Sequence, residues 1–185
     1  MVEGEWKTRQ HRGRKRRTWR KLHLGVDEAT GEIVAMVVTS NAVADGAVLE
    51  ALLEQIEDKI EQVSTDGAYD DRHSYNEIEG RGAKAVILPR KDAKVWQHGN
   101  RKGKPHPRDE NLRQIRKHGR KRWKRDSGYH CRSIAATTMF RFKAIFGGKL
   151  HARQFDNQAV EFFIKRAALN CMMGIAKPDR YKVEA

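Results

Sequence analysis

An aspartate followed by a glycine stands directly after a short segment predicted to be a core strand. Asp66 and Gly67 follow residues 60–65. Open α/β sheets place ligands at the carboxyl ends of their strands. A carboxylate there, beside a glycine that permits close approach, suits a Mg²⁺ ion that bridges a phosphate. An Asp-Gly turn without chemistry is the alternative interpretation of the same two residues.

A row of side chains suited to a phosphate lies further along the chain. Tyr129, Arg132, Ala136 and Lys143 are separated by three, four and seven residues, so a continuous helix over 121–146 would present all four on one face. A hydroxyl donor, a planar guanidinium and an ammonium group together can bind a phosphate. The alternative is a solvated face whose side chains pack only through their stems.

The charge of the chain favours a polyanionic partner. The 185 residues carry a formal net charge of +14, and length alone allows one domain. The basic residues gather in two blocks, 7–21 and 90–125, on either side of an acidic and apolar segment at 45–62. Within these blocks we expect nucleic-acid contacts from Arg14, Lys15, Arg16, Arg17, Arg120, Lys121, Arg122 and Lys124.

Composition also excludes several classes of protein. No stretch approaches about 18 uncharged apolar residues, so we expect no membrane span. The first residues are charged and lack an apolar segment, so no signal peptide is predicted, and a cytoplasmic location follows. Cys131 and Cys171 are too few for a disulfide framework and too far apart for a CxxC metal motif, and we expect them to be inert.

The elements that must position these residues alternate between strands and helices. Strands are predicted at 18–27 and 32–40, joined by a hairpin turn at 27–31, and at 60–65 and 85–88. Asp45 is predicted to cap a helix over 46–58, and further helices are predicted at 71–80, 107–118, 121–146 and 155–175, with a polar, basic loop inserted at about 90–108. Phe140, Phe142, Ile145 and Phe146 are expected in the core. The order predicts a mixed α/β sheet with flanking helices.

Several segments resemble a known family, the DDE transposases of bacterial insertion sequences, in particular the group called insertion-sequence-five. They are GEWKTRQH (4–11), KRRTWRKLHLGVDEATGEI (15–33), DGAYDDR (66–72), SGYHCRS (127–133), TMFRFK (138–143) and NQAVEFFIKRAALN (157–170). The family signature on the long helix is Tyr, two residues, Arg, three residues, Glu, six residues, Lys. Here Tyr129, Arg132, Ala136 and Lys143 occupy its four positions.

The resemblance implies a ribonuclease-H-like fold in which three acidic residues hold two Mg²⁺ ions for attack on a DNA phosphodiester. Asp66 matches the second acidic residue, as a catalytic metal ligand, and Tyr129, Arg132 and Lys143 match residues that grip DNA. The partners implied are the insertion-sequence ends, target DNA and a second copy in a homodimer, with no small-molecule substrate.

Two departures from the family pattern predict that this chain alone is inactive. Ala136 stands where the family has its Glu, and the family's first Asp belongs to a strand that precedes GEWK. Neither Asp27 nor Glu161 lies on the right element to replace them. We therefore expect residues 1–185 to be the C-terminal part of a catalytic domain, truncated at its N-terminus and without the first central strand. The alternative functions are a non-catalytic DNA-binding protein derived from a transposase and, with less support, an RNA-binding protein.

Overall fold

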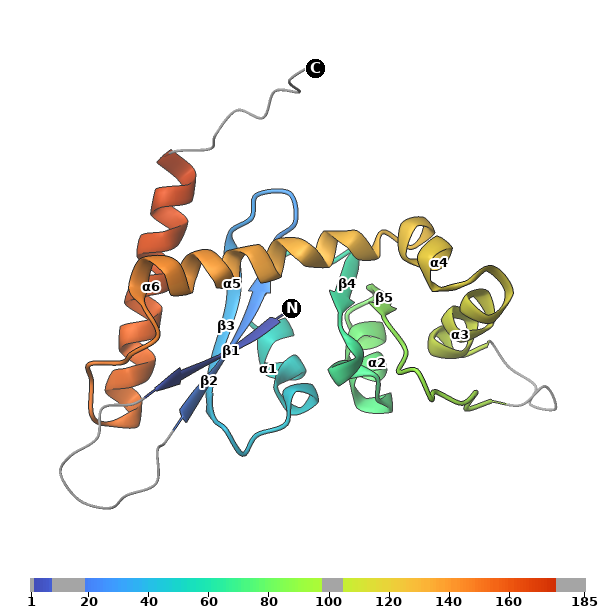
Figure 1. Ribbon diagram of the computed structural model, residues 1–185, viewed down its shortest axis with the longest axis horizontal. Coiled ribbons are helices and arrows are strands. Elements are labelled where there is room, and N and C mark those ends of the chain that lie inside the picture. The colour runs from blue at the N-terminus through green and yellow to red at the C-terminus, as the bar shows by residue number, and fades with distance from the viewer. Residues whose placement is uncertain (1, 8–18, 98–104, 176–185) are drawn as a thin grey trace.

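A computed structural model describes residues 2–7, 19–97 and 105–175 (Figure 1). The chain forms two small sheets, with α5 running across both of them and α6 at one end. This is the mixed α/β class that the sequence predicts.

The first sheet is antiparallel, with the order β1-β2-β3. Its strands are β1 (Val2–Lys7), β2 (Trp19–Val26) and β3 (Ile33–Ser40). The predicted hairpin turn between β2 and β3 is confirmed: the Asp27 carboxylate accepts hydrogen bonds from the backbone of Ala29 and Thr30, and Gly31 has a φ of 77°. Sequence patterning did not predict β1, which pairs with β2 from Val2–Leu24 to Lys7–Trp19.

The second sheet consists of two parallel strands, β4 (Gln62–Thr65) and β5 (Lys84–Ile87). The 3-10 turn η2 (Gly67–Tyr69) and helix α2 (Arg72–Gly80) connect them. The side chain of Asp71 caps α2 by accepting from the Ser74 amide at 2.8 Å. Within the described residues, the two sheets are not hydrogen bonded to each other.

The predicted helix over 46–58 is wrong in length and in its cap. A 3-10 turn η1 (Asp45–Val48) leads into a short helix α1 (Leu49–Leu53). Asp45 is the first residue of η1, after the cap position at Ala44, and its carboxylate pairs with Lys21 of β2 at 3.1 Å. An ion pair across the fold therefore replaces the local interaction that the sequence suggested.

The C-terminal half is helical, as predicted, but the long helix is interrupted. Its elements are α3 (Pro107–His118), α4 (Arg120–Asp126), the 3-10 turn η3 (Tyr129–Arg132), α5 (Ser133–Phe146) and α6 (Phe155–Ile175). Gly128, with a φ of 74°, lies in the left-handed region and ends the helical run after α4. The prediction of one helix over 121–146 is therefore wrong, because a left-handed residue cannot continue a right-handed helix.

Each sheet has its own apolar core. Leu22, Leu24 and Met36 of the first sheet pack against Phe142 of α5 and Phe162 of α6. The second core joins α1, α2, β4 and β5 through residues that include Leu49, Val63, Tyr75, Ile78 and Ile87. Phe142 and Phe146 lie in or against the first core as predicted, but Phe140 and Ile145 are 72% and 48% exposed, because α5 turns only one face to the sheet.

Candidate nucleic-acid interface

Asp66 lies at the carboxyl end of β4, where the strand turns into η2. Its Oδ1 accepts a hydrogen bond from the Ala68 amide at 3.0 Å and so caps the turn. A Cβ on Gly67 would lie 3.3 Å from the Leu88 carbonyl oxygen, so glycine permits the close approach of the chain after β5. The Asp66 side chain remains 38% exposed. The position at a strand end therefore matches the sequence prediction.

Arg132 binds the carboxylate of Asp66. The Nη2 atom of Arg132 donates to Oδ2 of Asp66 at 2.7 Å, across 66 residues of sequence. Both side chains are partly exposed, and such pairs contribute at most about 1 kcal/mol to stability. The pair therefore matters mainly for orientation: it fixes a guanidinium beside the Asp66–Gly67 turn.

Tyr129 points into the protein, which differs from the predicted row. Its ring is 92% buried and packs on Trp123 with ring centroids 5.7 Å apart. The left-handed Gly128 places Tyr129 in η3, before α5 begins, so it does not share the outer face of that helix. Burial raises the pKa of the Tyr129 hydroxyl, while Arg132 lowers it and Asp66 raises it further. The hydroxyl thus stays protonated beside the Asp66–Arg132 pair.

Lys143 and Ala136 lie on the exposed side of α5. Lys143 follows Arg132 by eleven residues, which corresponds to ~16 Å along a helix axis. Lys143 therefore lies over the first sheet rather than at Asp66. The structure brings Asp66, Arg132 and Tyr129 together and leaves Lys143 apart from them.

Arg90, which follows β5, is a site residue that sequence reasoning missed. Its Nε donates to the Gly67 carbonyl at 3.1 Å, and its own carbonyl accepts from Nη2 of Arg120 at 3.0 Å. Both guanidinium groups therefore lie near the Asp66–Gly67 turn. Arg90 is 23 residues from Gly67 in sequence, and no local pattern joins them. Their contact could have been predicted only from the fact that both residues follow strands that lie parallel in one sheet.

A buried ion pair holds Arg90 in place. Asp70 accepts from the Arg90 amide at 3.1 Å and from Nε of Arg108 at 2.6 Å. Arg108 also lies over the Trp96 ring, 3.9 Å from its centroid. Part of the second basic block is thus buried structure, and Arg108 is not available to bind a polyanion.

The predicted cations of α4 form an exposed surface next to this site. Lys121 and Arg122 are exposed, Arg122 pairs with Asp126 at 3.3 Å, and Nζ of Lys124 lies 5.4 Å from the centroid of the Tyr129 ring. Contacts therefore run from Lys124 through Tyr129 and Arg132 to Asp66. The predicted residues Arg14, Lys15, Arg16 and Arg17 lie outside the described residues.

The described residues do not fit a Mg²⁺ ion at Asp66. One oxygen of Asp66 caps η2, and the other binds a cationic guanidinium. In residues 2–7, 19–97 and 105–175, the group of side chains close enough to share a metal is Glu50, His73 and Glu77, which does not include Asp66. Ala136 offers no ligand.

Asp27 and Glu161 make their contacts elsewhere in the fold. The Asp27 carboxylate holds the β2–β3 turn through the Thr30 hydroxyl at 2.8 Å. Glu161 accepts from the His151 amide and from Lys165. Among the described residues, Asp66 thus belongs to no group of three side chains close enough to share a metal ion.

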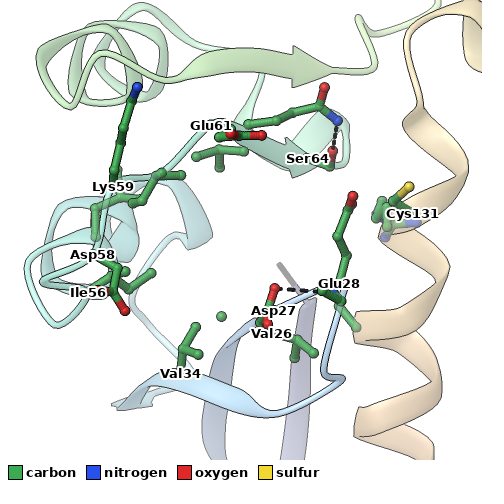
Figure 2. A pocket seen from close by; sticks show the side chains of 18 residues that line it. Val26, Asp27, Glu28, Val34, Ile56, Asp58, Lys59, Glu61, Ser64 and Cys131 are labelled. Carbon is green, nitrogen blue, oxygen red and sulfur yellow. Dashed lines mark hydrogen bonds between the residues drawn. The ribbon is translucent and has the colours of Figure 1, made fainter.

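A cavity of about 520 Å³ separates the two sheets (Figure 2). Its lining includes Val26 and Val34 from the first sheet, Val63 and Ser64 from β4, and Arg132. In Figure 2 Glu28, from the β2–β3 turn, points toward Cys131. A hydrogen bond to Glu28 and then burial raise the pKa of the Cys131 thiol, which fits the prediction that this cysteine is unreactive.

The fold and the site together define an α/β domain in which cations border the acidic end of a strand. The model of the transposase DDE domain family matches residues 2–171, and the chain belongs to this family. Members cleave and join DNA, so DNA is the family's partner. The mixed α/β architecture is consistent with the ribonuclease-H-like fold of the family. No solved structure matches the chain. Among the described helices, none is both long and apolar enough to cross a membrane.

Proposed function

We propose that this chain is a transposase-derived DNA-binding domain of the insertion-sequence-five group that does not cleave DNA by itself. The observation that carries the proposal is the contact between Arg132 and Asp66 at 2.7 Å. The guanidinium of Arg132 binds the Asp66 carboxylate oxygen that a metal ion would need, and its positive charge repels a cation at that position. At the same time, it belongs to a group of cations suited to a phosphate.

The phosphate contact we propose uses three arginines of different elements. Arg90 and Arg132 bind the Asp66–Gly67 turn directly, and Arg120 binds the carbonyl of Arg90. A guanidinium has five N–H donors, so Arg132 can retain its bond to Asp66 and still donate to a phosphate oxygen. Lys121, Arg122 and Lys124 of α4 extend the positive surface along the DNA backbone.

We also propose that the cavity between the sheets is the place of the strand on which the family carries its first Asp. The support is that β4 pairs only with β5 among the described residues, and that the cavity separates β4 from the end of β2. A strand edge that has no partner among the described residues, beside a cavity, is suited to accept a further strand.

Binding of a fluorescent DNA duplex over a series of salt concentrations tests the phosphate contact. We expect affinity that falls with salt at a slope of about −0.9 per phosphate contacted, and that is unchanged by EDTA. The variants Arg90→Ala, Arg120→Ala and Arg132→Ala should each lower the affinity and reduce the slope by about one. The matched control is Lys149→Ala, which removes an exposed positive charge in the loop after α5.

Three results would contradict the proposal. Wild-type affinity in all three arginine variants would exclude the Asp66–Gly67 turn as a phosphate site. Metal-dependent nicking of a supercoiled plasmid, lost in Asp66→Ala, would show that the chain is an active nuclease. Tighter binding of RNA than of duplex DNA would support the RNA-binding alternative instead.

A further inference from the structure

The outward face of α6 is apolar along most of its length. Its exposed residues recur at intervals of three and four, the period of one helix face. They are Val160, Phe163, Ile164, Ala167, Ala168, Cys171, Met172 and Ile175. The exposure is large: 65% for Ile164 and 82% for Ile175. We call these eight residues the α6 stripe.

Two polar residues of α6, Arg166 and Asn170, are turned toward the first sheet instead. Arg166 donates to the carbonyls of Ile33 and Val34, and Asn170 exchanges two hydrogen bonds of 3.0 Å with the backbone of Ile33. These contacts give hydrogen-bond partners to the backbone of Ile33 and Val34 on β3, which is the last strand of its sheet. A further apolar row, Phe162, Leu169 and Met173, packs on the core.

The helix is therefore apolar on two opposite sides, and only one of them is covered. A helix of this kind is normally buried on both sides. A contiguous exposed apolar surface on a protein marks a binding site for another molecule. The α6 stripe thus needs a partner that is apolar and elongated.

The order of the residues along the stripe fits a second copy of this chain as the partner. Reversed about the midpoint between Ala167 and Ala168, the stripe superimposes on itself: Val160 faces Ile175, Phe163 faces Met172, and Ile164 faces Cys171. Large residues lie at both ends and alanines lie at the centre, where two helices must approach most closely. A two-fold interface requires such self-complementarity.

The charges of α6 permit this pairing although the whole chain is strongly basic. The helix contains two acidic residues, Asp156 and Glu161, and two basic ones, Lys165 and Arg166, so its own formal charge is zero. Lys165 and Glu161 pair with each other at 2.7 Å. The net charge of +14 therefore lies elsewhere and does not concentrate on the stripe.

We propose that two copies of the chain dimerise through an antiparallel pair of α6 helices, with the two-fold axis at Ala167 and Ala168. The proposal does not depend on DNA binding or on the Asp66 site. It gives the expected homodimer a specific surface and a specific register.

Sedimentation analysis of the chain over a range of concentrations tests the dimer. We expect a particle of twice the monomer mass, and a monomer in Ala168→Glu, because that variant places two carboxylates at the axis. Asn157→Glu, an exposed change near the start of α6 and outside the stripe, should remain dimeric. Circular dichroism checks that both variants are folded. A wild-type monomer at every concentration, or an unaffected dimer in folded Ala168→Glu, would overturn the proposal.

Disulfide trapping tests the register independently. The test uses a chain with Ile164→Cys and Cys131→Ser. In the antiparallel pair, the new cysteine of each copy faces the native Cys171 of the other copy, so oxidation should yield a dimer joined by disulfides. Glu57→Cys, in the exposed loop after α1, should yield none at the same protein concentration. A disulfide between two Cys171 residues in the chain without Ile164→Cys would indicate parallel helices and contradict the proposal.

Discussion

Asp70 and Arg108 form an ion pair that is almost fully buried, with two hydrogen bonds of 2.6 and 3.1 Å between the carboxylate and the guanidinium. The side chains are 1% and 5% exposed. The pair connects the end of η2 with the first turn of α3, and Arg108 also donates to the Lys94 carbonyl at 2.7 Å. It thereby fixes the segment that carries Arg90 against the second sheet.

Breaking this pair should destabilise the protein strongly. Arg108→Ala leaves the Asp70 carboxylate buried without its main partner, and we expect a loss of about 3–5 kcal/mol in the free energy of unfolding. Urea denaturation measures it. Arg116→Ala, an exposed arginine of the same helix, is the matched control and should change stability by less than about 0.5 kcal/mol. Equal effects of the two variants would contradict the structural role of Arg108.

Stability should also fall at acidic pH through His106. Its Nδ1 accepts from the Arg108 amide at 3.2 Å and caps α3, so the ring must be neutral. Burial lowers the pKa of His106 from 6.5, with an opposing contribution from Asp109. The unfolded chain therefore takes up the proton more readily, and this stabilisation is complete above pH 6.5 and lost as the pH falls through the folded pKa.

Urea midpoints at neutral and mildly acidic pH measure the effect. His106→Asn keeps a capping side chain that does not titrate, so it should flatten the pH dependence at a cost of about 1 kcal/mol or less. His23 should leave a residual slope, because burial lowers its pKa as well. An unchanged pH dependence in His106→Asn would show that the His106 cap does not titrate in this range.

The charge of Asp66 should oppose DNA binding if its site contacts a phosphate. Asp66→Asn keeps an oxygen for the Ala68 amide and removes a negative charge close to Arg132. Two unit charges 4 Å apart in water interact by about 1 kcal/mol, so we expect roughly fivefold tighter binding at low salt. The same change at Asp156, which is exposed at the start of α6, should have little effect. Weaker binding in Asp66→Asn that appears only with Mg²⁺ would instead indicate a metal ligand.

Asn170 should contribute to stability through the edge of β3. Asn170→Ala removes both hydrogen bonds to Ile33 and leaves its backbone groups without these partners, at an expected cost of about 1–3 kcal/mol. Asn157→Ala, an exposed position on the same helix, is the control. Both substitutions raise helix propensity, so thermal unfolding of the two variants separates the loss of the inward contact from that gain.

Local patterns predicted the elements well and the long-range contacts poorly. The bounds 107–118 and 155–175 agree with α3 and α6, because apolar periodicity and the Pro107 start are properties of the sequence nearby. Asp45 shows the limit: it has the residue type of a cap, but Lys21 binds it across the fold.

The candidate site shows the same division. The strand-end position of Asp66 and the proximity of Arg132 were predictable, the first from the pattern and the second from the family resemblance. The inward turn of Tyr129 was not, since it depends on the left-handed backbone of Gly128. Arg90 was missed because its link to Gly67 depends on how two parallel strands end side by side.

Gly128 gives the interface its geometry through one backbone angle. With a φ of 74°, it sets the direction in which α4 leaves the start of α5, and thus the angle between the lysines and arginines of α4 and the Asp66 carboxylate. A residue with a Cβ would favour a right-handed conformation there and straighten the two helices into one rod. The lysines and arginines of α4 would then lie farther from Asp66 at the end of β4. The charged side chains of the protein would all still be present.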